Sequence, residues 1–362
     1  MCNEPRKSIL IGFGFFLLAA SCTPTPMGRS ILPPLERAKI PPPGSPLRAF
    51  AEFRGIHIGT SAERQLLDLE PPYAQTLSRE FNMLTPRFAM KFGPLRPTRQ
   101  YFYFWDADRI VDFAEANGMQ VRGHTLVWHR VLPRWLTEGK FSQAELVAIL
   151  REHILTVVAR YKGRMVAWDV VNEAISDDGS LRDTIWLRGI GSKYIDLAFQ
   201  WAHEADPGAQ LFYNDYGGEG LNRKSDAIYR LVRGLQKRGV PIHGVGLQLA
   251  IALESSLRGR EVAANMNRLA SLGLKIQITE MDVRIRRTVT ERDLAEQARI
   301  YGDMLGACLS TPNCTAFLVW DFTDRHSRTL ESFPGCDPAM IFDASYHPKP
   351  AYHALIDVLA GR

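Results

Sequence analysis

The sequence predicts an α/β fold, a closed (β/α)8 TIM barrel, from two observations. One pattern repeats eight times: a short apolar run, then a longer segment with apolar residues three and four positions apart. Polar side chains gather where the apolar runs end, and in a barrel those ends meet on a single face. An open, doubly wound sheet is the competing architecture, but no glycine-rich phosphate loop follows the first apolar run.

Residues 1–21 are expected to be a signal peptide, and the lipoprotein type is favoured. A basic start precedes the apolar run 9–20, which is too short to span a bilayer. Small residues then lead into Cys22, the candidate lipidation site, in a pattern that resembles a bacterial lipobox although Ala19 stands where leucine is usual. Ordinary cleavage, with Cys22 left in a tail, is the alternative. We therefore expect export to the bacterial cell envelope, in the outer membrane or facing the periplasm, with a lipid anchor in the membrane.

Residues 22–46 are rich in proline and predict an extended tether ahead of the folded domain, 47–362. A domain of that length suits a single α/β barrel, and 46% of the whole chain is hydrophobic. The formal net charge is +5, and no basic run interleaved with aromatic residues occurs in the sequence. Nucleic acid is therefore not expected as a partner, and we expect a monomer.

The eight short apolar runs are the expected strands of the barrel. They cover 55–60, 81–86, 121–128, 166–174, 209–216, 243–250, 275–283 and 316–322. Several of the intervening helices have recognisable ends. Asp106 and Ser142 are expected to be N-caps, and Gly118 and Gly239 are expected to follow helix C-termini.

The cysteines predict one disulfide bond and no metal site. Cys308 and Cys314 flank a short, turn-rich loop, and an exported protein allows them to oxidise. Cys336 is then unpaired, because Cys2 leaves with the signal and Cys22 is the candidate anchor. No pair of Cys or His residues has ligand spacing with a second pair to complete it. We therefore expect neither a metal ion nor a cofactor.

Two carboxylates stand at the ends of strands that would lie opposite each other in the barrel. Glu173 ends the run 166–174, and Glu280 lies near the end of the run 275–283. Burying a carboxylate costs several kcal/mol unless charge or hydrogen bonds compensate. Either one alone could be a salt-bridged residue at a strand end. Together they are the minimum machinery for hydrolysing a glycosidic bond, with one acid/base and one nucleophile.

Several motifs in this order resemble glycoside hydrolase family 10, the endo-β-1,4-xylanase family of (β/α)8 barrels. They include RGHTLVWH, WDVVNEAISDDGSLRDTIW, HGVGLQ, ITEMDV and HPKPAYHAL, and the resemblance runs from about Phe53 to Leu359. It implies a retaining β-glycosidase that acts on xylan or a related β-glycan. Glu173 would be the acid/base and Glu280 the nucleophile, with their carboxyl groups roughly 5 Å apart.

The resemblance also implies a set of substrate-binding residues. Asn172 would hydrogen-bond the sugar 2-hydroxyl, an interaction that strengthens in the transition state. The subsite of the cleaved sugar would be lined by Lys91, His124, Trp128, Gln248 and Trp320. Each aromatic or histidine could instead be a core residue, but their common position at strand ends favours contact with a sugar ring.

The sequence departs from the family pattern around this subsite. Arg87 and Phe88 stand where a Glu-Asn pair usually grips the second xylose, and Val131 replaces a glutamine. Ala250 stands where a histidine usually hydrogen-bonds the nucleophile. One donor fewer would raise the pKa of Glu280.

Several arginines follow the strand ends on the expected catalytic face. Arg328 replaces the family's second active-site tryptophan, and Arg87 and Arg328 are candidate substrate-binding residues. The others are Arg284, Arg286, Arg287 and Arg325. Arginine binds carboxylates bidentately, so the β-glycan could be acidic. Local ion pairing is an alternative of equal weight.

Two functions remain open from the sequence. The first is an active retaining glycosidase, and the second is a glycan-binding surface lipoprotein with weak or lost catalysis. The substitutions at Ala250 and around Arg87 motivate the second. Retention of Glu173, Glu280 and Asn172 favours the enzyme.

Overall fold

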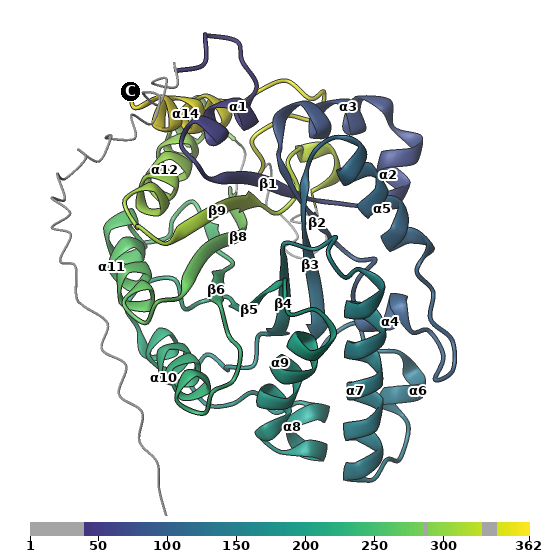
Figure 1. Ribbon diagram of the computed structural model, residues 1–362. Helices are drawn as coiled ribbons and strands as arrows, with labels where there is room; N and C mark the ends of the chain where they lie inside the picture. Colours follow the sequence, from purple (N-terminus) through teal and green to yellow (C-terminus); the bar gives the residue numbers. More distant parts are fainter. Residues whose placement is uncertain (1–39, 286–288, 328–338) are drawn as a thin grey trace, which may run out of the picture. The chain divides into compact units, whose positions relative to one another are not determined.

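The computed structural model describes residues 40–285, 289–327 and 339–362. Within these residues eight parallel strands close into a barrel, and helices surround it (Figure 1). The neighbour order runs from β6 down to β1 and then through β9 to β8, and a β6–β8 pairing completes the ring. The predicted (β/α)8 barrel is confirmed.

Each barrel strand overlaps one of the eight predicted apolar runs. The barrel strands are β1 (His57–Ala62), β2 (Met83–Pro86), β3 (Gln120–Val127), β4 (Ala167–Asn172), β5 (Gln210–Asp215), β6 (Gly244–Leu247), β8 (Lys275–Arg284) and β9 (Cys314–Val319). A further short strand, β7 (Ala250–Ala252), pairs with the C-terminal part of β8. Parallel strands that are covered on both faces are apolar along almost their whole length. The continuous apolar runs in the sequence therefore predicted the strands correctly.

Helices connect successive strands on the outside of the barrel. They are α1 (Leu47–Phe53), α2 (Arg64–Leu69), α3 (Pro71–Glu80), α4 (Phe92–Leu95), α5 (Trp105–Ala116), α6 (Arg134–Thr137), α7 (Gln143–Arg160), α8 (Ile185–Ile190), α9 (Lys193–Ala205), α10 (Arg223–Lys237), α11 (Gly259–Ala270), α12 (Glu291–Leu309), the 3-10 turn η1 (Asp324–His326) and α14 (Pro350–Ala360). Three of the four predicted helix ends are confirmed. Ser142 caps α7 in a capping box, and Gly118 and Gly239 follow α5 and α10 at φ 63° and 71°.

The fourth predicted helix end was wrong. Helix α5 begins at Trp105 with Phe104 as its N-cap residue, so Asp106 lies inside the first turn. The Asp106 carboxylate instead accepts a hydrogen bond from Arg64 Nε at 2.6 Å. A side chain engaged with another helix is not needed at its own N-terminus, and a carboxylate in the first turn still suits the helix dipole.

The barrel interior combines tight apolar packing with a buried charge. A Cβ atom on Gly123 of β3 would come within 2.2 Å of the Trp168 ring, so only glycine allows β3 and β4 this packing. Arg122 is fully buried and donates to Asp169 on the neighbouring strand and to Gln277 on β8. Arg122 and Asp169 form a polar layer inside the barrel, and Asp169 also contacts His124.

The predicted disulfide between Cys308 and Cys314 is present and joins the end of α12 to the start of β9. Cys22, Cys336 and the whole signal segment 1–21 lie outside the described residues, as do residues 22–39 of the tether. Among the helices that are described, none is both long and apolar enough to cross a membrane.

Candidate active site

Glu173 and Glu280 open onto one cleft of about 640 Å3 at the C-terminal ends of the barrel strands. Glu173 follows β4 directly, and its backbone has φ 57°, a left-handed conformation that is uncommon for a residue with a side chain. Its N–H donates to the carbonyl of Asn214 at 2.9 Å, and its carbonyl accepts from Arg182 Nε at 2.8 Å. These bonds hold a strained backbone of the kind that clusters at functional sites.

Side-chain amides connect the two carboxyl groups. Asn214 on β5 donates to Glu280 Oε1 at 2.9 Å, and the same amide lies 2.8 Å from the Asn172 side chain. Thr279 fixes the other end of the Asn214 amide through a hydroxyl donated to its oxygen at 2.7 Å. Gln248 donates to Glu173 Oε1 at 3.2 Å. Both carboxyl groups are therefore held in fixed positions by neighbours that are themselves bonded.

The electrostatics of the cleft make the Glu280 carboxyl group harder to ionise than an exposed one. Burial, and then the charges of Glu173 and Asp169, raise the pKa of Glu280 well above its ordinary value, while the Asn214 hydrogen bond acts in the opposite direction. The sequence predicted this direction from the missing donor at Ala250, but burial is the largest cause in the structure. Two interacting carboxyls lose their protons in two separate steps that belong to the pair.

His124 is held neutral beside the carboxylates. Burial lowers the pKa of His124 despite the adjacent carboxylate of Asp169, whose Oδ2 lies 3.0 Å from Nδ1 of the ring. Burial also acts to raise the pKa of Asp169, but Arg122 and His124 outweigh it, so this carboxyl stays ionised. The ionised Asp169 selects the imidazole tautomer with its proton on Nδ1. Nε2 can then accept a hydrogen bond from a hydroxyl group in the cleft.

Two tryptophans and a lysine line the cleft close to His124. Lys91 Nζ lies 4.8 Å from the Trp128 ring centroid and 5.9 Å from that of Trp320. The rings of Trp320 and His124 meet edge to face at 5.3 Å. Both tryptophans are partly exposed. Aromatic faces beside hydrogen-bonding groups suit a sugar ring, which has apolar faces and polar edges.

The structure brings most of the predicted site residues to this cleft and places Arg87 elsewhere. The cleft is lined by Glu173, Glu280, Lys91, His124, Trp128, Asn172, Gln248 and Trp320. Arg87 is buried beside it, where Nε contacts Glu63 at 2.7 Å and Nη1 contacts Asp321 at 2.5 Å. This geometry matches the alternative of local ion pairing for Arg87.

The remaining arginines divide into paired residues and residues that are not described. Arg284 Nε lies 3.6 Å from Asp282, and Arg325 Nε lies 2.8 Å from Glu70. Arg286, Arg287 and Arg328 lie outside the described residues.

Sequence reasoning assigned no role to several residues that line the cleft or hold the carboxylates. They are Arg130, Asn214, Tyr216, Glu219 and Asp282. Asn214 and Asp282 lie at strand ends, where the sequence predicts polar residues on the catalytic face, but their individual contacts depend on the tertiary structure. Arg130 and Glu219 belong to loops, whose conformation leaves no periodic signal in the sequence.

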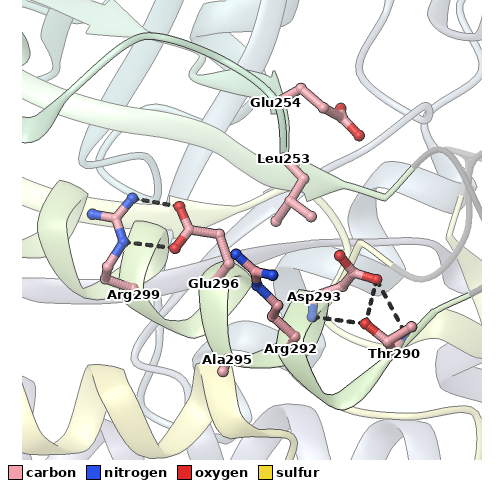
Figure 2. Close-up of a pocket in the computed structure, with 8 residues that line it drawn as sticks. All are labelled: Leu253, Glu254, Thr290, Arg292, Asp293, Ala295, Glu296 and Arg299. Atoms are coloured by element: carbon pink, nitrogen blue, oxygen red, sulfur yellow. Dashed lines mark hydrogen bonds and ion pairs between the residues drawn. The ribbon is translucent and has the colours of Figure 1, made fainter.

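A second hollow, of about 610 Å3, lies between the segment after β7 and the start of α12 (Figure 2). Several of its polar groups bind one another. Arg299 Nη2 contacts Glu296 at 2.6 Å, and Thr290 and Asp293 form the capping box of α12. It contains none of the residues around Glu173 and Glu280, and we assign it no chemistry. Among the residues with described positions, no cluster of three or more His, Cys, Asp or Glu side chains could hold a metal ion.

Comparisons with known proteins agree with this geometry. The model of glycosyl hydrolase family 10 matches residues 46–358. Endo-1,4-beta-xylanase B of Thermotoga neapolitana is 43% identical over 87% of this chain and 91% of its own length. Endo-1,4-beta-xylanase 1 of Humicola insolens is 35% identical over 88% of this chain and 75% of its own length. The crystal structure of xylanase 10B from Thermotoga petrophila in complex with xylobiose matches with a TM-score of 0.85, at 43% identity over 87% of this chain and 97% of that one. The chain therefore belongs to glycosyl hydrolase family 10.

Proposed function

We propose that the protein is a retaining xylanase that hydrolyses β-1,4-linked xylan by double displacement. The observation that carries the proposal is the pair of carboxyl groups, Glu173 and Glu280, that face one cleft and are held by the amides of Gln248 and Asn214. A fixed pair of this kind is what a retaining glycosidase requires. Xylan is the substrate that fits best, because similar proteins are named xylanases and one similar structure holds xylobiose.

The reaction follows from the positions of the two carboxyl groups. Ionised Glu280 attacks the anomeric carbon while protonated Glu173 gives its proton to the departing glycosidic oxygen. The sugar is then bound covalently to Glu280. In the second step Glu173, now ionised, removes a proton from water, which attacks the same carbon and releases Glu280. Two inversions at one carbon leave its configuration unchanged.

The surroundings of the cleft support a role for its remaining residues. Asn172 lies beside Glu173 and suits a hydrogen bond to a sugar hydroxyl, while Trp128 and Trp320 offer ring faces. Arg87 gives no support to an acidic glycan as the substrate, because it is already paired with Glu63 and Asp321. A surface protein that only binds glycan is not favoured, because the acid/base and nucleophile candidates share one cleft.

The catalytic assignment is tested with small and activated substrates. An aryl β-xyloside and xylotetraose should be hydrolysed, and a 2-fluoro xylosyl reagent should label Glu280. Glu280→Ala should abolish turnover of both substrates. Glu173→Ala should slow xylotetraose far more than an aryl xyloside with a good leaving group, which needs no protonation. A label on another residue, or equal losses on both substrates, would refute the assignment.

We also propose that the protein is an exported lipoprotein anchored through Cys22. The basic start, the short apolar run 9–20 and the small residues before Cys22 support this proposal. The Pro-rich segment 22–46 would then hold the barrel away from the bilayer. Metabolic labelling with a radioactive fatty acid should mark the full chain, and Cys22→Ala should remove the label. A labelled Cys22→Ala variant would contradict the proposal.

A further inference from the structure

We propose that Tyr101, Tyr103 and Trp105 form a second binding site for a polysaccharide chain, outside the active-site cleft. These three residues are called the aromatic row below. The proposal rests on the proposed xylanase function for the identity of the polysaccharide. None of the three residues lines the cleft that contains Glu173 and Glu280.

The aromatic row results from an alternation of outward and inward rings along a short segment. Tyr101, Tyr103 and Trp105 are 56%, 37% and 59% exposed. Phe102 and Phe104, between them, turn inward and stack on each other with ring centroids 5.8 Å apart. The segment runs from the connection between α4 and α5 into Trp105, the first residue of α5, at the outer edge of the barrel (Figure 1).

The inward rings anchor the segment to the body of the protein. Phe102 stacks on His153 of α7 at 6.1 Å, and Phe104 meets Tyr161 edge to face at 6.1 Å. The backbone is also fixed, because Tyr103 N–H donates to the carbonyl of Leu95 at 2.8 Å. A surface held in this way loses little conformational freedom when a ligand binds, which favours affinity.

Exposing three aromatic side chains within five residues needs an explanation. Burying an aromatic side chain removes roughly 150 to 250 Å2 of surface from water, which stabilises the fold. These exposed rings contribute little of that stabilisation. Single exposed apolar residues are ordinary, whereas several on one short segment form a local surface feature of the kind that is often functional. The Tyr103 hydroxyl donates to Asp106 at 3.4 Å, and its oxygen can still accept a hydrogen bond from a ligand.

A sugar polymer fits this surface better than a protein or a membrane. About half of each ring is exposed, which amounts to roughly 300 Å2 for the row, whereas a stable protein partner needs about 800 Å2. The nearby charges are balanced, because Arg64 pairs with Asp106 at 2.6 Å and Arg109 with Asp68 at 3.0 Å. These two arginines are therefore already paired with carboxylates and are not available to bind anionic lipid. A pyranose ring, with an apolar face and hydroxyl groups at its edge, matches a row of rings bordered by polar groups.

A second site would act through effective concentration. A polymer held at the aromatic row remains bound to the enzyme after each cleavage, so polymer affinity rises without any new contact at Glu173 or Glu280. Hydrolysis of a small aryl xyloside, which fits within the cleft, should not depend on the row.

The test compares polymer binding with small-substrate turnover in the full-length protein. The triple variant Tyr101→Ala, Tyr103→Ala, Trp105→Ala is measured by depletion onto insoluble xylan, in a Glu280→Gln background that prevents hydrolysis. We expect polymer affinity to fall at least about tenfold, because each lost ring contact costs roughly two- to tenfold. The same three substitutions, with Glu280 intact, should leave kcat/KM for an aryl β-xyloside unchanged.

Matched variants separate ring stacking from other causes. Leu69→Ala removes an apolar side chain that is 79% exposed but has no ring, and it should leave xylan affinity unchanged. Trp105→Phe should retain most of the affinity that Trp105→Ala loses, and these single variants serve if the triple variant does not fold. Unchanged affinity in the triple variant, or an equal loss in Leu69→Ala, would overturn the proposal.

Two further outcomes are equally decisive. If light scattering shows that the row variants only convert a dimer into a monomer and xylan binding is unchanged, the row is a contact between copies and the proposal fails. If the aryl xyloside and xylotetraose are not hydrolysed while xylan binding still depends on the row, the proposed function fails and the second site stands.

Discussion

Arg87 and Asp321 form a buried ion pair at the edge of the cleft, with Arg87 Nη1 2.5 Å from Asp321 Oδ1. Asp321 lines the cleft and directly follows Trp320, and its own backbone has φ 68°. The Ser61 hydroxyl of β1 donates to the same carboxylate at 3.1 Å. Arg87 also contacts Glu63, so this pair ties the ends of β1, β2 and β9 together.

Replacing Arg87 by methionine should destabilise the protein by about 3 to 5 kcal/mol, because Asp321 would remain as a buried charge without its main partner. Arg87→Lys keeps the charge and should lose less. Chemical denaturation provides the measurement. We also expect KM for an aryl xyloside to rise, because Asp321, the neighbour of Trp320 in the chain, would lose the Arg87 side chain that holds it.

The matched control is Arg134→Met, since Arg134 pairs with Glu138 on the surface and both side chains are mostly exposed. That substitution should change the free energy of unfolding by less than about 1 kcal/mol. If Arg87→Met proved as harmless as the control, Arg87 would not be held in its buried pair.

Asn214→Ala should lower kcat on xylotetraose by roughly tenfold to a hundredfold. The substitution removes the hydrogen bond to Glu280, and a bond to a charged group is worth about 1.5 to 3 kcal/mol. Steady-state kinetics and a denaturation curve measured on the same sample separate catalysis from stability. Thr279→Val removes only the hydroxyl that orients Asn214, so its effect should be smaller. A larger loss in Thr279→Val than in Asn214→Ala would contradict this order.

The disulfide between Cys308 and Cys314 closes a loop with a sequence separation of 6. Such a short loop restricts the unfolded chain little, so the Cys308→Ala, Cys314→Ala variant should lose only about 2 kcal/mol of unfolding free energy. Chemical denaturation without reductant checks this value. An unchanged midpoint would mean that the bond contributes nothing to stability.

The barrel could be predicted from the sequence because each buried strand is a run of apolar residues and each run ends in polar residues. Strand β7 was missed, since Ala250–Ala252 is too short to show a period. The position of Glu173 and Glu280 followed from topology alone, because strand ends meet on one face of a barrel.

The role of Arg87 could not be predicted in the same way. Its partners Glu63 and Asp321 are 24 and 234 positions away in the chain, and no local pattern links them. The sequence showed a cation at the end of β2, but only the tertiary structure shows that carboxylates from β1 and β9 already surround it. The hypothesis of an acidic substrate assumes that arginines such as Arg87 have no carboxylate partner within the protein.

The reaction needs one carboxyl group protonated and the other ionised, which gives its pH dependence a specific form. The reactive state has Glu173 protonated and Glu280 ionised, so kcat/KM should fall at low pH when both are protonated and at high pH when both are ionised. Because burial and the charge of Glu173 raise the pKa of Glu280, the state with both groups ionised is reached only above the ordinary carboxyl range. The alkaline limb of the wild-type profile is therefore expected above that range.

Glu173→Gln tests this origin of the alkaline limb. Glutamine cannot lose a proton and places no charge beside Glu280. Once Glu280 has ionised in this variant, no further ionisation at position 173 can occur at higher pH. With an aryl xyloside whose leaving group needs no protonation, the kcat/KM profile of Glu173→Gln should keep its acid limb and become flat at high pH. An alkaline limb that persists in Glu173→Gln would assign it to a different group.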